Sequence, residues 1–406
     1  MSHPGEDTAA PIEAPTAEWV DPAVMVRDPY DTYERLRELG PVVWVPAVGK
    51  YLVTSFAGCR DVEADQETYS ASVTGGSATL ARALGATPML RKDDPEHAVE
   101  RQAVNPTMRP RNIRQTWVPV FERNARAHLA TLRDHGPDAA DLNRDYAAPV
   151  AAQNLVDLLG LRGASAADVQ RWSHDFIAGT GNLHDDAGIW ERCDAARQEV
   201  DALLEELIPW YRGHPDGSMT SALVNGGLSA EAVAANVKLT ISGGMNEPQH
   251  MVTAVVWALS RHPDQRRRVL EDPASWPAVF DEAVRWLSPI GMYPRETTRA
   301  TVLAGTRLPE KAPIGVVVAA ANRDPAVFDR AQLFDSARPK QSHLGFGSGV
   351  HLCVGHWAAR ISIGEIAVPL AHEVLPGLRS DPRREEQWAG WVFRGLTSLP
   401  VTWGPE

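Results

Sequence analysis

The residues best suited to chemistry stand in a glycine-rich loop near the end of the sequence, residues 346–355, which read FGSGVHLCVG. A cysteine thiolate that binds iron needs a backbone that approaches closely, amide donors around the sulfur and an apolar side chain beside it. The glycines permit a tight turn, and Phe346 could shield the sulfur. A helix that begins near Gly355 would stabilise a thiolate through its N-terminal dipole. We therefore predict that Cys353 is an iron ligand.

This loop resembles the haem-binding loop of the cytochrome P450 family, and the resemblance extends over nearly the whole chain. The alternative is a glycine-rich loop around a buried structural cysteine, which is the common state of a free Cys. A chance match at six specified positions has a probability on the order of 10⁻⁶ in a chain of this length, which favours the ligand. The six positions are Phe346, Gly347, Gly349, His351, Cys353 and Gly355. The resemblance implies haem b with an axial cysteine thiolate, in a mainly α fold with a small β portion.

A second set of residues resembles the structural triad of the same family. Glu282 and Arg285 match its Glu-x-x-Arg helix, and Arg338 matches the third member. The i,i+3 spacing of the first two places them on one helical face, where they can pair. An isolated pair of this kind would be a surface salt bridge of little value. Beside the cysteine loop, we interpret the three residues as a buried scaffold.

Haem carries two propionates, so its pocket needs cations at the rim. By the resemblance, His97, Arg101, Arg295 and His351 contact the propionates, and Phe346 and Gly347 belong to the cofactor-binding loop. Taken singly, each charged residue would be read as an ordinary solvated side chain.

The stretch Gly243-Gly244-Met245-Asn246-Glu247-Pro248 lies inside a long predicted helix and marks the place where oxygen would be activated. Proline has no N–H, so the carbonyl of Gly244 loses its i+4 donor and the helix should distort. The two glycines would leave room over a flat cofactor. The alternative is a kink with only a packing role.

Most members of the family carry an acid followed by threonine here, whereas this chain has Pro248 after Glu247. The resemblance then leaves Glu247 and Asn246 as the catalytic candidates, with Glu247 and ordered water supplying protons. A secondary use of hydrogen peroxide is a further hypothesis.

The amide–Glu–Pro arrangement resembles a narrower group, the bacterial aromatic O-demethylases that act on guaiacol-like methoxyphenols. The C-terminal stretch 387–399 resembles the same group. This likeness implies a compact aromatic pocket lined by Phe393, with Tyr293 near the substrate ring and Gly244 and Thr180 also in the pocket. Small residues at 178–181 would leave space for a second methoxy group, so we predict syringol first and guaiacol next. As bare residues, both aromatics are more often core than pocket.

The implied reaction is oxidative O-demethylation, which yields formaldehyde and a catechol-type phenol from dioxygen and a methoxyphenol. Only about fifty residues follow Cys353, too few for a typical domain, so electrons would come from a separate NADH-dependent reductase with flavin and an iron–sulfur centre. Arg360, His356 and Lys340 are candidates for its docking site. Two alternatives stay open: hydroxylation of another hydrophobic substrate, and a non-catalytic haem-binding sensor.

Several elements must position these residues. A long helix is predicted from Ser229 to about Arg261, apolar on most sides and therefore central. Residues 112–212 have a helical pattern, interrupted at Gly136, Gly160 and Gly179. Residues 41–56 suggest a β-hairpin, while 296–303, 315–319 and 390–403 suggest strands.

The composition limits the function classes. The chain has 406 residues, 44% hydrophobic, and a formal net charge of −12 without a basic block, which disfavours nucleic acid and anionic membranes as partners. No apolar run approaches the roughly 20 residues of a membrane span. The three cysteines disfavour a disulfide scaffold and suit a reducing cytoplasm; Cys59 and Cys193 are predicted to be small core residues. We expect residues 1–16 to form a loose arm and 17–406 a single domain.

Overall fold

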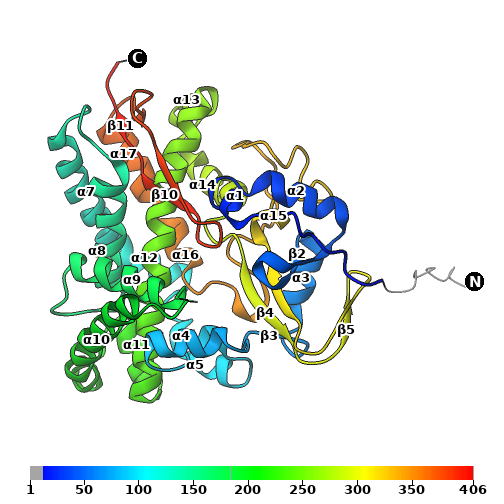
Figure 1. Ribbon diagram of the computed structural model, residues 1–406. Helices are drawn as coiled ribbons and strands as arrows, with labels where there is room; N and C mark the ends of the chain where they lie inside the picture. The colour runs from blue at the N-terminus through cyan, green and yellow to red at the C-terminus, as the bar shows by residue number, and fades with distance from the viewer. Residues whose placement is uncertain (1–11, 183, 406) are drawn as a thin grey trace, which may run out of the picture.

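A long central helix organises the structure (Figure 1). The computed structural model describes residues 12–182 and 184–405. Helix α12 (Ala230–Arg261) begins where predicted, because the Ser229 hydroxyl caps it by accepting from the backbone N–H of Ala232 at 3.1 Å. It continues without interruption through Pro248, and it ends before α13 (Pro263–Glu271). Most of its side chains are buried, so the prediction of a central helix is confirmed.

Other helices surround α12 on one side of the molecule, the left side in Figure 1. The helices of the chain outside α12 and α13 are α1 (Pro22–Arg27), α2 (Tyr30–Leu39), α3 (Phe56–Ala64), α4 (Gly76–Leu84), α5 (Glu96–Val104), α6 (Pro110–Asn112), α7 (Val118–His135), α8 (Ala148–Leu159), α9 (Ala166–Thr180), α10 (Ala187–Gly213), α11 (Met219–Asn225), α14 (Trp276–Leu287), α15 (Val318–Ala321), α16 (His356–Ala359) and α17 (Val368–Val374). Three π-helical segments, Ile113–Trp117, Asn143–Ala147 and Arg360–Ala367, join or precede them.

The predicted helical region is confirmed, and so are its breaks at Gly136 and Gly160. The break expected at Gly179 is wrong, because that residue lies inside α9. A Cβ atom there would come within 2.5 Å of the Cys193 sulfur on α10. Gly179 therefore allows two helices to pack closely and does not end one. Cys59 and Cys193 are both buried, which confirms their prediction as core residues.

A five-stranded sheet lies on the other side of the molecule, in the order β1-β2-β7-β4-β3. Its strands are β1 (Val42–Val45), β2 (Lys50–Val53), β3 (Tyr69–Ser70), β4 (Tyr293–Thr297) and β7 (Pro313–Val316). The hairpin predicted within 41–56 is confirmed by the antiparallel pairing of β1 with β2. The predicted strand over 315–319 is confirmed only in its first half, because the chain turns into α15 after Val317.

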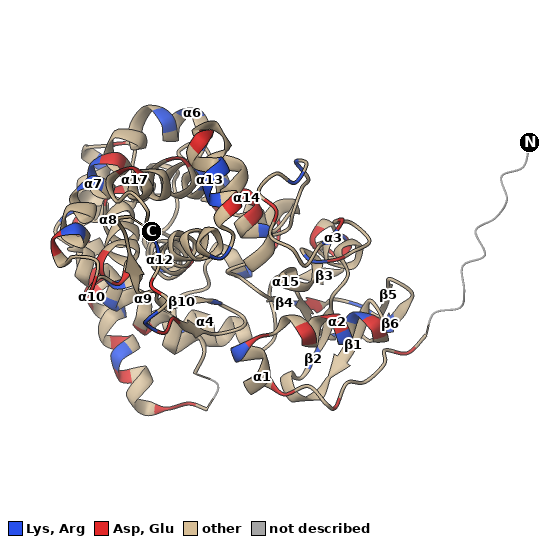
Figure 2. Ribbon diagram, turned by 90° about the horizontal axis from the view of Figure 1, so that it is seen from above, with Lys and Arg blue, Asp and Glu red and all other residues tan. Residues whose placement is uncertain are grey.

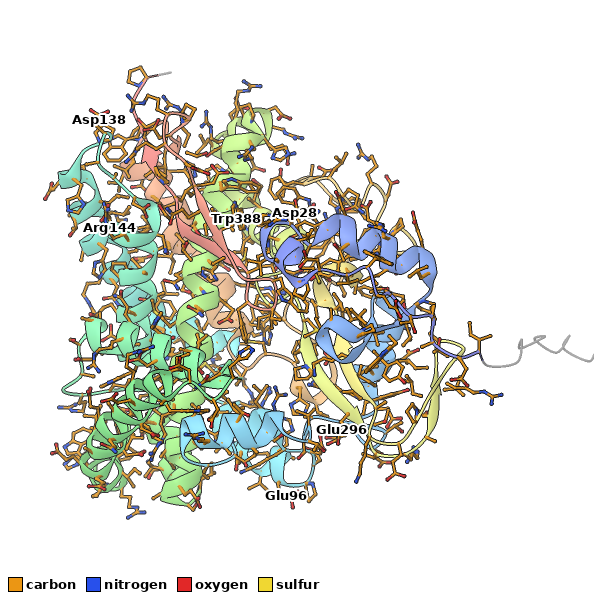
Figure 3. The ribbon with its side chains drawn as sticks, in the orientation of Figure 1. Asp28, Glu96, Asp138, Arg144, Glu296 and Trp388 are labelled. Carbon is orange, nitrogen blue, oxygen red and sulfur yellow. The ribbon has the colours of Figure 1, made fainter. Side chains whose placement is uncertain are left out.

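Three two-stranded ladders complete the β portion. They pair β5 (Thr301–Leu303) with β6 (Thr306–Leu308), β8 (Arg379–Ser380) with β11 (Val401–Thr402), and β9 (Gln387–Ala389) with β10 (Gly395–Ser398). The predicted strands over 296–303 and 390–403 are therefore each divided by a turn. Arg394 anchors the C-terminal ladder: it donates to the carbonyls of Val26 and Arg27 and lies over the Trp388 ring. Figure 3 shows Trp388 beside Asp28, at the end of α1.

The N-terminal arm was predicted to be loose over residues 1–16, of which residues 1–11 lie outside the described chain. For residues 12–16 the prediction is wrong, because this segment is held by backbone hydrogen bonds. Ile12 N–H donates to the Gly305 carbonyl at 3.0 Å, and Trp44 N–H donates to the Pro15 carbonyl at 2.8 Å. Edge strands offer unpaired backbone groups, and this segment satisfies some of them.

The hydrophobic core forms one large cluster among the helices and two smaller ones around the sheet. Acidic and basic residues are interspersed along the ribbon of the outer helices and loops (Figure 2). In the part of the chain that the structure describes, no helix is both long and apolar enough to cross a membrane.

Candidate active site

The cysteine loop is held against α3 by two glycines in the left-handed region. Gly347 has φ 69° and Gly349 has φ 62°. A Cβ atom on Gly349 would lie 2.2 Å from the backbone oxygen of Glu63, so no other residue fits without a shift of the loop or α3. The Cys353 N–H donates to the Phe346 carbonyl at 2.9 Å, which closes the loop.

The Cys353 sulfur lies beside a short helix, as predicted, since α16 begins directly after Gly355. Burial raises the pKa of the Cys353 thiol, whereas a hydrogen bond from the Gly355 backbone N–H lowers it. The carboxyl of Glu247 is near enough to raise it further. A coordinated metal cation deprotonates such a thiol outright, so the site suits a metal-bound thiolate better than a free one.

One face of α12 borders open space in the middle of the fold. A Cβ atom on Gly243 would meet nothing within 4 Å, and this residue is exposed although most of the helix is buried. Gly244 differs, because its Cβ would lie 2.9 Å from Leu155 of α8. The prediction that both glycines leave room for a ligand is corrected accordingly: Gly243 provides the space, and Gly244 permits helix packing.

Two histidines face each other with unpartnered ring nitrogens. The rings of His97 and His351 lie 4.1 Å apart between centroids. His97 Nδ1 contacts Asp94 Oδ1 at 3.0 Å, while the Nε2 atoms of both histidines are buried without a partner. Burial lowers the pKa of His97, against its hydrogen bond with Asp94. Burial, together with the neighbouring Arg295, His97 and Arg101, lowers the pKa of His351 to about 3.

Arginines supply the positive charge of this rim, which we call the cationic rim. Arg101 donates to the Leu352 carbonyl at 2.9 Å, and burial lowers its pKa. Arg295 is buried and donates to Glu63 Oε1 at 3.2 Å. Arg91, which the sequence analysis missed, has buried Nε and Nη1 atoms without a partner. Burial, together with the nearby charge of Arg295, lowers its pKa to about 10.

Burial of several cations and unpartnered donors together is costly unless an anion joins them. A cofactor that combines two carboxylates, a flat body and a thiolate-ligated metal meets each of these requirements. The donor set therefore fits haem. Cys353 would bind the iron, the rim residues His97, Arg101, His351, Arg91 and Arg295 would face the propionates, and Gly243 would border the opposite face.

Glu247 is the one acid on the open face of α12 near Gly243 among the described residues. Its Oε2 atom is buried without a hydrogen-bond partner. Burial raises its pKa to about 8, so it is mostly protonated at neutral pH. Asn246 is adjacent, and its Oδ1 accepts from Gln249 Nε2 at 2.9 Å. The site thus holds a neutral carboxylic acid that can donate a proton.

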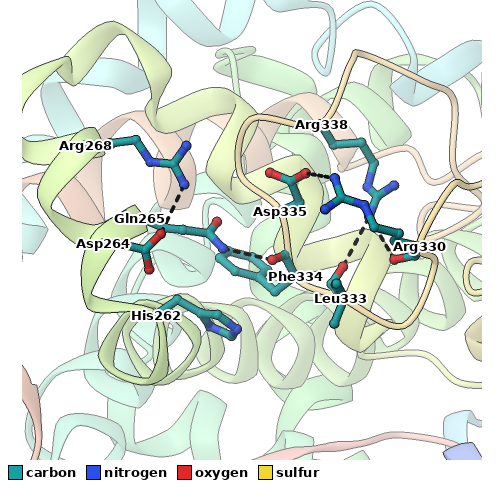
Figure 4. A pocket seen from close by; sticks show the side chains of 9 residues that line it. All are labelled: His262, Asp264, Gln265, Arg268, Arg330, Leu333, Phe334, Asp335 and Arg338. Atoms are coloured by element: carbon teal, nitrogen blue, oxygen red, sulfur yellow. Dashed lines mark hydrogen bonds and ion pairs between the residues drawn. The ribbon is translucent and has the colours of Figure 1, made fainter.

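The three triad residues meet where α14 packs against the loop at residues 329–338. Arg285 is 2% exposed, and its Nε and Nη2 donate to the two Glu282 oxygens at 2.7 Å each. Arg338 Nε donates to the same carboxylate at 3.3 Å. Figure 4 shows Arg338 beside Leu333 and Arg330, whose carbonyls accept from it, in a pocket that also holds Asp335. Every polar group is paired, as a scaffold requires.

A pocket of about 330 Å³ lies between α9 and α12. It is lined by Gln170, Ser173, His174, Ile177, Ala178, Met245, Asn246 and Gln249. Thr180, predicted in the substrate pocket, is not among these residues, because its hydroxyl turns back to the Ile177 carbonyl at 2.9 Å. Ile177 and Ala178, which precede it on α9, line this pocket instead.

The two predicted pocket aromatics lie in different surroundings. Phe393 is 42% exposed and follows the anchored Gly390 turn, which leaves its ring free to contact a ligand. Tyr293 lies beside the cationic rim, and its place near the substrate stays a prediction. Its ring lies 5.0 Å from the Arg295 guanidinium, and its hydroxyl is near Glu63 and Gly347. Alternate residues of a strand share a face, so Tyr293 on β4 follows Arg295 to the cationic rim.

The three candidate docking residues differ in their exposure and in the contacts that they already make. Arg360 donates to Asp281 at 2.9 Å and lies over the Phe346 ring. The His356 ring contacts the Cys353 carbonyl at 2.6 Å. Lys340 is exposed. Phe346 itself packs against Phe280 and His356 near the cysteine, where a shielding side chain was expected.

Comparisons with known proteins agree with this geometry. The family model described as Cytochrome P450 matches residues 276–368, which include the triad helix and the cysteine loop. The chain is 29% identical to pentalenic acid synthase of Streptomyces avermitilis, over 99% of this chain and 100% of that protein. It is 28% identical to cytochrome p450 CYP199A2 of Rhodopseudomonas palustris, over 93% and 92%.

Solved structures give the same result for the fold. The crystal structure of CalO2 has a TM-score of 0.85 at 28% identity, covering 95% of this chain and 98% of that chain. P450BioI in complex with an acyl carrier protein has a TM-score of 0.84 at 23% identity, covering 93% and 99%. The mainly α fold with a small β portion is thus the P450 fold. The chain thus has the P450 fold, matches the Cytochrome P450 family model over its triad helix and cysteine loop, and takes haem b, with an axial cysteine thiolate, as its cofactor.

Proposed function

We propose that this cytochrome P450 monooxygenase O-demethylates a small methoxyphenol, syringol before guaiacol. The observation that carries the proposal is a pocket of about 330 Å³, at the small end of ligand sites, which lies between α9 and the side of α12 adjacent to the open face of Gly243 and Glu247. Its apolar side chains, Ile177, Ala178 and Met245, suit an aromatic ring. Asn246 and Gln249 offer polar groups for a phenol and its methoxy oxygens.

The balanced reaction consumes one methoxyphenol, one dioxygen, one NADH and one proton. One oxygen atom enters the methoxy carbon, and the hemiacetal collapses to formaldehyde and a catechol-type phenol; the other oxygen leaves as water. Haem bound at Cys353 supplies the oxygen chemistry, with electron density from the thiolate. The chain contributes a proton from the Glu247 carboxyl. Asn246, next to Glu247 in the chain, lines the pocket, where its amide can orient the substrate.

Small side chains in the pocket support the proposed preference for syringol. Ala178 and the neighbouring Ile177 face Met245 and Asn246 across the pocket. A larger side chain at 178 would occupy the volume that a second methoxy group needs. Phe393 would contact the ring from the C-terminal turn, where its exposed face is free.

The electrons would come from a separate reductase that carries flavin and an iron–sulfur centre. Exposed Lys340 is the most available of the three docking candidates, because Arg360 is paired with Asp281. We expect Lys340→Glu to weaken reductase binding in a salt-dependent manner, with unchanged substrate affinity.

The experiment is a panel assay with the purified holoenzyme, a flavin and iron–sulfur reductase, and NADH. We expect formaldehyde in one-to-one ratio with NADH oxidised for syringol, a smaller yield for guaiacol, and a low-spin to high-spin shift on titration of each. Absence of formaldehyde from every methoxyphenol would refute the demethylase. A tighter spin shift with guaiacol than with syringol would refute the preference.

A second candidate is hydroxylation of a different hydrophobic substrate. It is favoured by the relatives, which include 6-deoxyerythronolide B hydroxylase of Saccharopolyspora erythraea at 27% identity over 92% of this chain and 96% of that protein. The same assay separates the two, since hydroxylation at a carbon without an ether oxygen consumes NADH and releases no formaldehyde.

A further inference from the structure

Two residues on α12, one helical turn apart, each have a buried polar atom without a hydrogen-bond partner. Glu247 Oε2 and His250 Nδ1 are both buried and make no hydrogen bond. The residues are i+4 and i+7 from Gly243, so all three share the helix face that borders open space. Neighbouring residues 246 and 249 face the pocket at α9 instead.

The side chain of His250 is buried between α12 and β10. It is 7% exposed, and burial lowers its pKa to about 4, so the imidazole is neutral at neutral pH. The ring packs against β10, where a Cβ atom on Gly395 would lie 2.0 Å from the ring Cγ. The backbone of Gly395 therefore fixes the ring from one side. A neutral imidazole has one N–H donor and one acceptor, and a buried one without a partner is costly.

A water molecule can satisfy both atoms. Buried waters typically make about three hydrogen bonds to polar groups that would otherwise be unpaired. In the arrangement that fits, His250 Nδ1–H donates to the water and the water donates to Glu247 Oε2. The acid then carries its proton on Oε1. No proton moves along this chain in the resting state; its effect is to choose which carboxyl oxygen is protonated.

We propose that His250 is a positioning residue, which holds an ordered water against Glu247 and thereby directs the acidic proton of Glu247 toward the open face beside Gly243. This inference rests on the proposed role of Glu247 as proton donor. His250 acts through Glu247 and touches neither substrate nor iron.

Substitutions at position 250 separate positioning from packing. His250→Leu removes the ring nitrogen, whereas His250→Asn returns an amide N–H near the position of Nδ1. His372→Leu is the matched control, because His372 is also buried with an unpartnered ring nitrogen but belongs to α17 and packs against Trp276 of α14. We expect His250→Leu to lower product formed per NADH about tenfold, the factor that one ordinary hydrogen bond supplies. His250→Asn should restore most of the loss, and His372→Leu should cause none.

Infrared spectroscopy gives a readout that packing does not move. The C=O band of the protonated Glu247 carboxyl, identified by its loss in Glu247→Gln, should rise in frequency in His250→Leu because a hydrogen bond to Oε2 is lost. A high-resolution structure of the wild-type holoenzyme should place a water within hydrogen-bond distance of both Glu247 Oε2 and His250 Nδ1. An empty position there would overturn the inference, as would an unchanged band in His250→Leu.

The two proposals fail in different ways. Normal coupling in Glu247→Gln would refute the acid role, whatever position 250 does. Strong uncoupling in Glu247→Gln with wild-type coupling in His250→Leu would leave the acid role in place and refute the role of His250.

Discussion

The protonation of Glu247 provides the sharpest test of the site. Burial raises its pKa from an ordinary value of 4.5 to about 8, a destabilisation of the carboxylate on the order of 5 kcal/mol. At pH 7 the folded protein should therefore hold about ten protonated carboxyls for each carboxylate. An ordinary carboxyl would be protonated in only about one molecule in 300 at that pH.

The assay is an infrared titration of the holoenzyme between pH 5 and pH 10, with Glu247→Gln as the blank. We expect a protonated carboxyl band that disappears with a midpoint near pH 8. Product formation should fall over the same range, because the neutral acid is the form that donates a proton. In Glu247→Gln this descending limb should be absent, and coupling should be low at every pH.

The same change in pKa has a consequence for stability with a definite sign. Between pH 4.5 and 8 the folded state holds a proton that the unfolded state has released, so stability falls as pH rises through this window. Glu247→Gln should therefore resist unfolding better than wild type at pH 9 and about equally well at pH 4. A carboxyl band that titrates near pH 4.5, or a variant that gains no stability at high pH, would refute the reasoning.

Three further predictions concern the scaffold, the loop and the pocket. Glu282→Ala leaves a buried arginine without its counter-charge, and we expect a loss of about 3–5 kcal/mol in unfolding free energy, measured by denaturant titration; a loss below 1 kcal/mol would contradict it. Gly349→Ala should abolish haem incorporation, measured by the haem absorption per protein, because the added Cβ meets backbone 2.2 Å away. Gly49→Ala, also at φ near +60° but with nothing within 4 Å, should cost only about 1 kcal/mol and keep its haem. Ala178→Phe should weaken syringol binding more than guaiacol binding in spin-state titrations, whereas Thr180→Phe should not discriminate between them; equal losses at position 178 would contradict the pocket assignment.

Local signals in the sequence were enough for the main elements. The central helix was predictable because Ser229 caps it and Pro263 follows its end, and both signals act within one turn. The hairpin over 41–56 was predictable for the same kind of reason, since Gly49 permits a left-handed turn between two apolar stretches. The strand expected at 315–319 failed in its second half, where tertiary packing turned alanines into a helical segment.

The site residues also fall into two groups, those that local spacing predicts and those that only long-range contacts bring to the site. Cys353 and the Glu282–Arg285 pair could be found because their spacing within a loop or a helix turn is fixed by local geometry. Glu63 and Arg91 could not, because each reaches the cationic rim only through contacts between segments far apart in sequence. The one signal for Arg91 was its place six residues before His97, which is too weak alone. The contact of Tyr293 with Glu63 was not predictable either, because the sequence does not state which face of β4 meets the cofactor loop.

The helical period predicts which residues of α12 share a face, but it does not predict what packs against that face. Counting 3.6 residues per turn from Gly243 places Glu247 and His250 on one face, and this much follows from the sequence. The period does not reveal that Gly395, 145 residues beyond His250, has no side chain and so brings its backbone against the imidazole. That contact fixes the ring and excludes a protein partner for it on one side. The proposed ordered water rests on a fixed, neutral histidine whose buried Nδ1 lacks a partner, one turn from a protonated acid.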